Sequence, residues 1–277
     1  MRRLLRHVTS LCLAVLIVTG VRVFCVSSYR VSTGSMQTIL QEGDVVLVNK
    51  MHSLSNPGRG RIAVFKSPLG QDSESPPLFL GRCAGMPGDT ILVTTGGCFV
   101  NGRPVQAESE KAFRIRKSVK TALLETLRHL DIPLRSVAED SLSMTIRLTV
   151  HEESLLRTHL HQALQIEPAP EAEWSYRFVI PFEGYDYRPD SLSLFLYAHA
   201  IGQETDGRVQ SDGVKLFAGS REVTTYRFVR DYYWMSSDGG DTVDSRHLGF
   251  VPRSCVTGNV WLCLYSRNKS RIFKRIY

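Results

Sequence analysis

The stretch that decides the fold, Ser32 to Lys50, reads STGSMQTILQEGDVVLVNK. Ser35 follows a glycine, a residue that permits backbone geometries other residues avoid, so another main chain can approach its hydroxyl closely. Glu42-Gly43-Asp44 is a turn signal, and Val45 to Val48 is a β-branched run typical of a buried strand. Taken alone, the pattern also fits a plain loop that leads into a strand.

Short apolar runs between Gly and Pro turns indicate an antiparallel β fold. Ile62 to Lys66 is one such run, and Leu78 onward is another, which ends in Pro87-Gly88-Asp89. Asn101-Gly102 predicts a tight hairpin. Further strands are predicted at Tyr176–Ile180, Leu192–Tyr197, Val214–Phe217 and Val223–Val229. Together these signals predict a mainly β, barrel-like domain.

The sequence pattern changes after Pro104 and predicts an inserted α/β module. Phe113–Arg116 and Leu142–Val150 alternate like strands, whereas Lys117–Leu130 and Glu152–Leu164 place leucines at helical spacing. The order is therefore β-α-β-α. Solvated helix or strand faces are the simpler interpretation of its histidines, and no metal site is predicted from His129, His151, His159 and His161.

The N-terminus predicts a membrane anchor. Arg2, Arg3 and Arg6 precede a nearly continuous apolar run from Val8 to Val26, which is long enough to span if Arg22 snorkels to the interface. The positive-inside rule then places the N-terminus in the cytoplasm and the main domain outside. A cleaved signal peptide and a buried soluble helix are the alternatives, but no A-x-A-like cleavage site follows at the right distance.

Charge and cysteine usage exclude other classes of function. The net charge of +7 over 277 residues is crowded at both termini and forms no basic stripe with interleaved aromatics, so we expect no nucleic-acid partner. Basic ends beside an apolar segment suit a lipid bilayer instead. The six cysteines form no CxxC pair and no zinc spacing, so no metal or cofactor is expected, and their disulfide pairing cannot be deduced from the sequence.

Three blocks in this order resemble the class I signal peptidases, membrane-anchored serine proteases that use a serine–lysine dyad. Gly34-Ser35-Met36 with Gly43-Asp44 resembles the nucleophile block. Arg82, Gly85 and Pro87-Gly88-Asp89 resemble the block that carries the lysine. Asp244-Ser245-Arg246 with Gly249-Phe250-Val251-Pro252 resembles the late block. The resemblance covers the anchor, residues 28–102 and residues 208–265.

The resemblance implies a role for each matching residue. Ser35 would be the nucleophile, and its backbone N–H with the Thr33 hydroxyl would form the oxyanion hole. Met36 would help to line the substrate pocket, and Thr242 would orient the base. Arg82 and Ser245 would support the site, while Asp244 and Arg246 would hold the late loop in place.

One position departs from the family pattern: Gly81 occupies the place of the general-base lysine, directly before Arg82. A guanidinium cannot replace that lysine because it stays charged. We expect Ser35 within side-chain reach of Gly81, with the two residues on adjacent β strands. A small void should mark the missing side chain, and Leu78 and Leu80 should lie around it. The late block also differs, because Ser236-Ser237-Asp238 stands where the family has Gly-Asp-Asn.

Three hypotheses remain open from the sequence. The first is a signal peptidase that removes signal peptides from exported precursors, with a base such as Lys66 or Lys50 or a water-mediated route. The second is a catalytically impaired paralogue that binds signal peptides or regulates secretion. The third is an anchored β-rich protein unrelated to proteolysis.

The sequence also predicts a domain order and a location. We expect residues 1–27 to form the cytoplasmic tip and anchor, 28–104 and 206–277 to form the catalytic β domain, and 105–205 to form the inserted module and linker. The expected location is the inner (plasma) membrane, single-pass, with the main domain on the periplasmic side. The expected partners are signal-peptide-bearing precursors and the lipid bilayer.

Overall fold

The computed structural model describes residues 7, 12–16, 19–32, 34–36, 39–51, 57–69, 76–94, 97–105, 110–132, 134, 136–159, 167–169, 175–190, 193–238 and 243–276. The chain divides into two compact units, Met1–Asp89 with Ile180–Tyr277, and Thr90–Val179. The structure is mainly β with antiparallel sheets, as predicted. The division into the four predicted domains stays a prediction.

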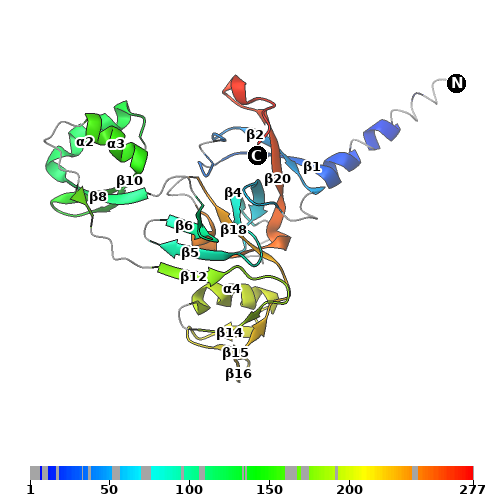
Figure 1. The fold of residues 1–277 in the computed structure, drawn as a ribbon. Coiled ribbons are helices and arrows are strands. Elements are labelled where there is room, and N and C mark those ends of the chain that lie inside the picture. Colours follow the sequence, from blue (N-terminus) through cyan, green and yellow to red (C-terminus); the bar gives the residue numbers. More distant parts are fainter. Residues whose placement is uncertain are drawn as a thin grey trace. The chain divides into compact units, whose positions relative to one another are not determined.

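A seven-stranded sheet organises the first unit. Its strands, in spatial order, are β1 (Val26–Arg30), β2 (Val45–Asn49), β20 (Val256–Tyr265), β3 (Ile62–Lys66), β4 (Leu78–Gly85), β18 (Tyr232–Ser236) and β19 (Val251–Pro252). Every neighbouring pair is antiparallel. The blue β2 therefore lies beside the red β20 in Figure 1, although the two strands are far apart in the sequence, and β1 lies on the other side of β2. The strands predicted from Val45, Ile62 and Leu78 are confirmed.

Two apolar clusters cover opposite faces of β3, because side chains alternate along a strand. One face belongs to a buried cluster of Val31, Met36, Leu40, Val46, Val48, Ile62, Val64, Val260, Cys263 and Ile276. The other face belongs to a buried cluster of Ala63, Phe65, Cys83, Tyr233, Met235, Leu248, Val251, Cys255 and Val256. We call these the first and the second cluster.

The second unit contains two four-stranded sheets. One has the order β12 (Ser175–Val179), β5 (Thr90–Thr94), β6 (Gly97–Val100) and β7 (Arg103–Pro104). The predicted hairpin joins β6 to β7, where Asn101 and Gly102 take φ of 50° and 78°, values that suit a tight two-residue turn.

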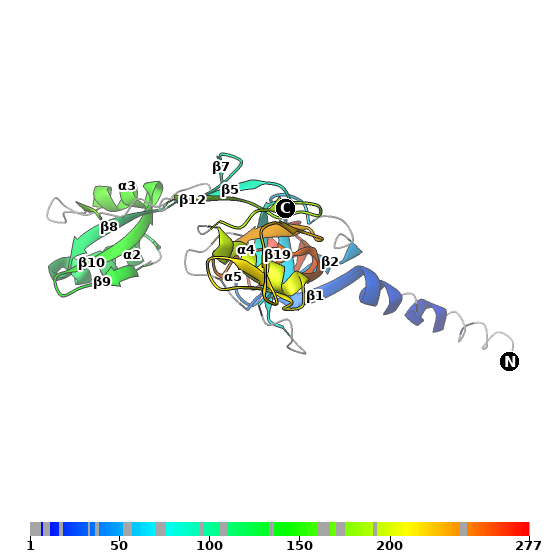
Figure 2. The same cartoon turned by 90° about the horizontal axis from the view of Figure 1, so that it is seen from below.

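The other sheet lies within the range that was predicted to be an inserted module. Its elements, in chain order, are β8 (Glu110–Arg116), η3 (Lys117–Val119), α2 (Lys120–His129), β9 (Ser136–Glu139), β10 (Ser143–Thr149), α3 (Val150–His159) and β11 (Glu167–Pro168). The strand order is β11-β8-β10-β9, and Figure 2 shows β8, β10 and β9 in sequence across it. Leucines of both helices pack on one face, against Phe113, Ile115 and Ile146. The predicted strands and helices occur as β8, α2, β10 and α3 in the predicted order, but β9 and β11 were not predicted.

One predicted strand is a helix: Leu194 to Tyr197 begins α4 (Leu194–Glu204), and Leu192 lies outside the described residues. The alternation of Leu and polar or aromatic residues suggested a strand. Leu194, Tyr197 and Ile201 are instead buried at helical spacing. The carboxylate of Asp190 accepts the Ser193 N–H at 2.9 Å and so holds the start of the helix.

Short elements complete the first unit around α4 and the C-terminus. They are η1 (Val21–Cys25), β13 (Asp186–Tyr187), β14 (Val209–Ser211), β15 (Leu216–Ala218), β16 (Arg221–Val223), β17 (Tyr226–Arg227), α5 (Ser245–Leu248), η4 (Arg253–Cys255) and η5 (Lys269–Arg271). Two other predicted strands are found only in part, because β15 begins at Leu216 and only Tyr226–Arg227 forms a strand between Val223 and Val229. Within the described part of the chain, no helix has the length and apolar character that crossing a membrane requires. The six cysteines, which all lie in the described ranges, form no disulfide with one another.

Candidate active site

Ser35 lies in a turn within the loop between β1 and β2, not on a strand adjacent to that of Gly81 as expected, and backbone bonds join the two ends of this loop. The turn follows β1, and Val31 donates its N–H to the Asp44 carbonyl at 2.8 Å, while Gly43 donates back to the Val31 carbonyl. Gly43 has φ of 92°, a conformation that favours glycine. The Met36 carbonyl accepts the N–H groups of two later residues in the same turn. Ser35 itself is buried, with 4% of its surface exposed.

The side chain of Met36 packs into the core beneath this turn. It is fully buried in the first cluster, with Leu40, Ile62 and Val64 among its members. This packing ties the serine turn to the sheet. Whether Met36 also lines a substrate pocket stays a prediction.

Asp238 joins the Ser35 turn to strand β4. Its backbone N–H donates to the Ser35 carbonyl at 2.8 Å. Its carboxylate forms an ion pair with Arg82, with Nη2 to Oδ2 at 3.2 Å, and the two side chains are only 15% and 22% exposed. A second nitrogen of Arg82 donates to the Gly60 carbonyl at 2.9 Å. The nucleophile block, the Arg82 block and the late block are therefore in direct contact.

Gly81 lies on β4 opposite Ala63 of β3, beside the end of β18. A Cβ at this position would lie 3.2 Å from Cε1 of Phe65, 3.2 Å from the Ser236 carbonyl oxygen and 3.5 Å from the Met235 Cβ. The expected void is therefore wrong at the Cβ position, because the neighbours have closed on the glycine. A side chain at this position would begin among members of the second cluster.

The residues expected around the missing side chain also need correction. Leu78 and Leu80 alternate with Gly81 along β4 and so point to the other face, where Leu80 packs against the first cluster. Phe79 and Cys83 share the face of Gly81. The apolar surroundings of position 81 are thus aromatic and sulfur-containing side chains.

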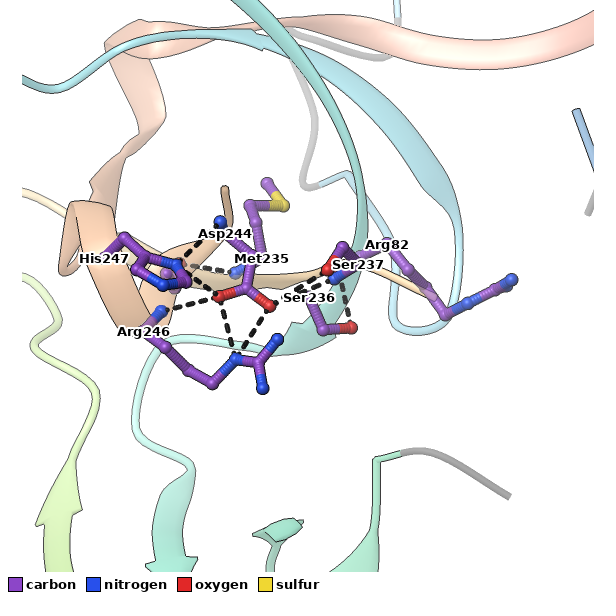
Figure 3. Close-up of polar contacts among 8 residues, drawn as sticks. Arg82, Met235, Ser236, Ser237, Asp244, Arg246 and His247 are labelled. Atoms are coloured by element: carbon purple, nitrogen blue, oxygen red, sulfur yellow. Dashed lines mark hydrogen bonds and ion pairs between the residues drawn. The ribbon is translucent and has the colours of Figure 1, made fainter. Parts of the chain in front are cut away.

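Asp244 holds the late loop together (Figure 3). Its carboxylate accepts from the backbone N–H of Arg246 at 2.9 Å and from the Arg246 Nε at 3.1 Å. It also accepts from the N–H and the hydroxyl of Ser237, each at 3.3 Å. Asp244 caps α5, and His247 completes a capping box. Only 3% of Asp244 is exposed, so these bonds satisfy a buried charge.

Ser245 fixes the strand that carries Met235. Its hydroxyl accepts the Met235 N–H at 2.8 Å, next to the point where the β18–β4 register shifts. Ser245 is 1% exposed. The late loop therefore holds the chain at two places. One is Met235, near the end of β18, and the other is Ser237, the residue before Asp238.

The Pro87-Gly88-Asp89 turn closes the other end of β4. Asp89 accepts the Met86 N–H at 2.6 Å and pairs with Arg59 at 2.6 Å. The hydrogen bond to Asp89 raises the pKa of Arg59. Burial raises the pKa of the nearby Cys83 thiol to about 12, so this cysteine remains a neutral, inert thiol.

Two predicted site residues, Thr33 and Thr242, lie outside the described residues. The separation of Ser35 from Gly81 stays a prediction, as do the catalytic roles. Sequence reasoning missed the part played by Asp238, although a carboxylate in the late block and Arg82 in the lysine block were a signal of a pair. In the described ranges, no group of three or more His, Cys, Asp or Glu is placed to hold a metal ion.

The two lysines considered as replacement bases lie at or next to the ends of strands. Lys66 is exposed at the end of β3, opposite Leu78, and alternation points it away from the face of Gly81. Lys50 donates its backbone N–H to the Cys25 carbonyl. It thus lies at the end of the β1–β2 ladder remote from Val31, about 17 Å along the strands.

Comparisons with known proteins agree with the sequence resemblance. A family model described as signal peptidase, peptidase S26, matches residues 4–152. The chain is similar to a signal peptidase I of Leptolyngbya laminosa, 30% identical over 107 residues, which cover 37% of this chain and 53% of that protein. It is also similar to a signal peptidase I of Aquifex aeolicus, 36% identical over 87 residues, which cover 31% and 32%.

A further relative is named as inactive. The chain is 26% identical over 132 residues to an inactive signal peptidase IA of Staphylococcus aureus, with 47% of this chain and 70% of that protein covered. The chain spans about half, 53%, of the length of the Leptolyngbya relative, and 42% of a probable signal peptidase I-2 of Synechocystis.

Proposed function

This chain belongs to the signal peptidase family, peptidase S26, and we propose that it binds the signal peptides of exported precursors at the Ser35 site with little or no hydrolysis. The observation that carries the proposal is Gly81, at the position of the family's general-base lysine. The packing of Phe65, Met235 and the Ser236 carbonyl around that glycine supports it.

The chemistry requires a base that the described site lacks. Attack by the Ser35 Oγ on the scissile carbonyl forms a C–O bond, and the hydroxyl proton must pass to an acceptor. A desolvated lysine can accept it, because burial lowers the pKa of its ammonium. Glycine has no side chain for this step. The Arg82 guanidinium stays protonated and already pairs with Asp238.

The retained parts of the site support binding. The serine turn, β4 and the late loop are held in contact through Asp238 and Asp244. The Ser35 N–H, with the Thr33 hydroxyl by family resemblance, would hydrogen-bond the carbonyl oxygen of a bound peptide. Thr242, Arg246 and Ser245 keep their supporting roles in this proposal.

We also propose the membrane placement. The arginines before the apolar run from Val8 support a single-pass anchor with the N-terminus in the cytoplasm; the anchor ends before β1, at Cys25 instead of the predicted residue 27, because Val26 and Ser27 pair with β2. The β domain formed by residues 28–104 and 206–277 would then lie on the periplasmic side of the inner membrane, beside emerging precursors. Residues 105–205 would be an insertion in that domain.

A working signal peptidase is the second candidate. The observation that favours it is Ser35 itself, retained in a buried turn that is bonded to the Arg82 strand. In that case a water molecule or a residue outside the described ranges takes the proton.

Binding and cleavage of one precursor separate the two candidates. The full-length protein in detergent is mixed with a fluorescent signal-peptide-bearing precursor and with the same precursor lacking its signal peptide. We expect binding that depends on the signal peptide, with the precursor intact. Cleavage that is lost in Ser35→Ala would establish the second candidate, and equal binding of both precursors would reject both.

A further inference from the structure

We propose that Asp238 is a positioning residue that holds the Ser35 turn in register with position 81 on strand β4; this inference rests on the proposed function of the Ser35 site. Asp238 contacts both parts at once. Its N–H fixes the Ser35 carbonyl at 2.8 Å, and its carboxylate fixes Arg82 at 3.2 Å.

The carboxylate of Asp238 makes the connection between the Ser35 turn and β4 rigid. Arg82 directly follows Gly81 and has a second bond to the Gly60 carbonyl at 2.9 Å, so its guanidinium is oriented by two partners. A largely buried ion pair with a hydrogen-bonded arginine has a defined geometry. Through that pair, the backbone of Asp238 is held at a fixed distance from β4.

The backbone bond then transmits this position to the serine. Fixing the Ser35 carbonyl restricts rotation of the residue that bears the nucleophile. The late loop supports the same segment, because Asp244 accepts the N–H of Ser237, the preceding residue. Asp238 therefore connects the segment that Asp244 holds to Ser35.

The contacts distinguish Asp238 from a simple surface ion pair. The Arg227–Asp186 pair in the same unit spans 3.8 Å, and its side chains are 70% and 56% exposed. Removing that exposed pair should have little effect. Removing the Asp238 carboxylate leaves Arg82 with an unpaired, mostly buried charge and frees the Ser35 turn.

The test uses the full-length Gly81→Lys protein as the reporter of catalysis. Adding Asp238→Ala is expected to lower kcat by about 10²-fold with KM unchanged, as for a nucleophile displaced by about 1 Å. Asp238→Asn keeps an oxygen acceptor for Arg82 and should restore most of kcat. Asp186→Ala is the matched control and should leave kcat unchanged. Equal kcat per folded molecule in all four proteins would overturn the inference.

Hydrogen exchange tests the inference independently of cleavage and binding. In the otherwise unaltered protein, Asp238→Ala should cause loss of amide protection at Asp238 and in the Ser35 turn, where Ile39 and Leu40 donate to Met36. Asp186→Ala should not. Unchanged protection in Asp238→Ala would overturn the inference even if signal peptides bind, whereas a lack of signal-peptide binding with lost protection would reject only the proposed function.

Discussion

Gly81→Lys should convert this chain into an active peptidase, and the structure shows what the substitution has to overcome. Gly81 does not take a positive φ, so its backbone conformation is compatible with a side chain. The new Cβ would meet Phe65 and the Ser236 carbonyl at 3.2 Å. The Phe65 ring can shift by a few tenths of an ångström, but the main-chain oxygen is less free to move.

Whether Gly81→Lys becomes active depends on the folding free energy that it loses and on the rate that it gains. Overpacking of this kind costs about 1–3 kcal/mol of folding free energy, which a domain of this size can tolerate. General-base assistance is typically worth about 10²–10⁴ in rate. Phe65, Phe79 and Met235 surround the site, so desolvation lowers the pKa of the new amine and makes it a base near neutral pH. The gain in rate should therefore exceed the loss in folded protein.

The assay is cleavage of a signal-peptide-bearing precursor in detergent, corrected for the folded fraction. Gly81→Met is the matched control, because it fills the same space without an amine and should stay inactive. The rate of Gly81→Lys should rise with pH through the amine pKa, since the neutral amine is the base. Adding Ser35→Ala should abolish cleavage. A folded but inert Gly81→Lys protein, or equal rates for Gly81→Met, would refute the reasoning.

Three further results are expected. Asp244→Ala should lower the melting temperature by the equivalent of about 1–3 kcal/mol, because several donors lose their buried acceptor; a change no larger than that of Asp186→Ala would contradict this. Cys83 should resist maleimide at pH 8 until the protein is unfolded in urea, because its pKa is raised to about 12; rapid labelling of the native protein would show that it is accessible. Bonds from the Leu142 and Ser143 N–H groups lower the pKa of Asp140 to about 2, against about 3.9 unfolded, so its contribution to stability is present above pH 4 and is lost toward pH 2. Asp140→Asn should remove that part of the pH dependence of urea unfolding, and an unaltered pH profile would contradict the assignment.

The sequence was a good guide wherever a local pattern and its tertiary environment agree. Ile62 to Lys66 is a strand because an apolar, β-branched run suits a position with both faces covered, and Val45 to Val48 is a strand with alternate residues fully buried. Asn101-Gly102 makes its hairpin because both residues tolerate positive φ. The order of the three blocks predicted the family, to which the chain belongs.

Local patterns failed where tertiary contacts decide. Leu194 to Tyr197 alternates like a strand, but the bond from the Ser193 N–H to Asp190 and burial at helical spacing make it a helix. The void at Gly81 was expected from the absence of one side chain, whereas close packing lets Phe65 approach. A carboxylate in the late block and Arg82 suggested a pair, but only the structure identifies Asp238 as the partner, because its contacts join residues that are about 150 or more positions apart in the chain.

The central claim is that a signal peptide binds at Ser35 and is not cut. It is tested most directly with a precursor that carries a photoreactive residue at its cleavage site, incubated with the unmodified full-length protein and irradiated. The account predicts cross-links to the Gly34–Met36 turn or to strand β4, competed by unlabelled signal peptide, with the precursor at full length. Cleaved precursor, or cross-links confined to other parts of the chain, would contradict it.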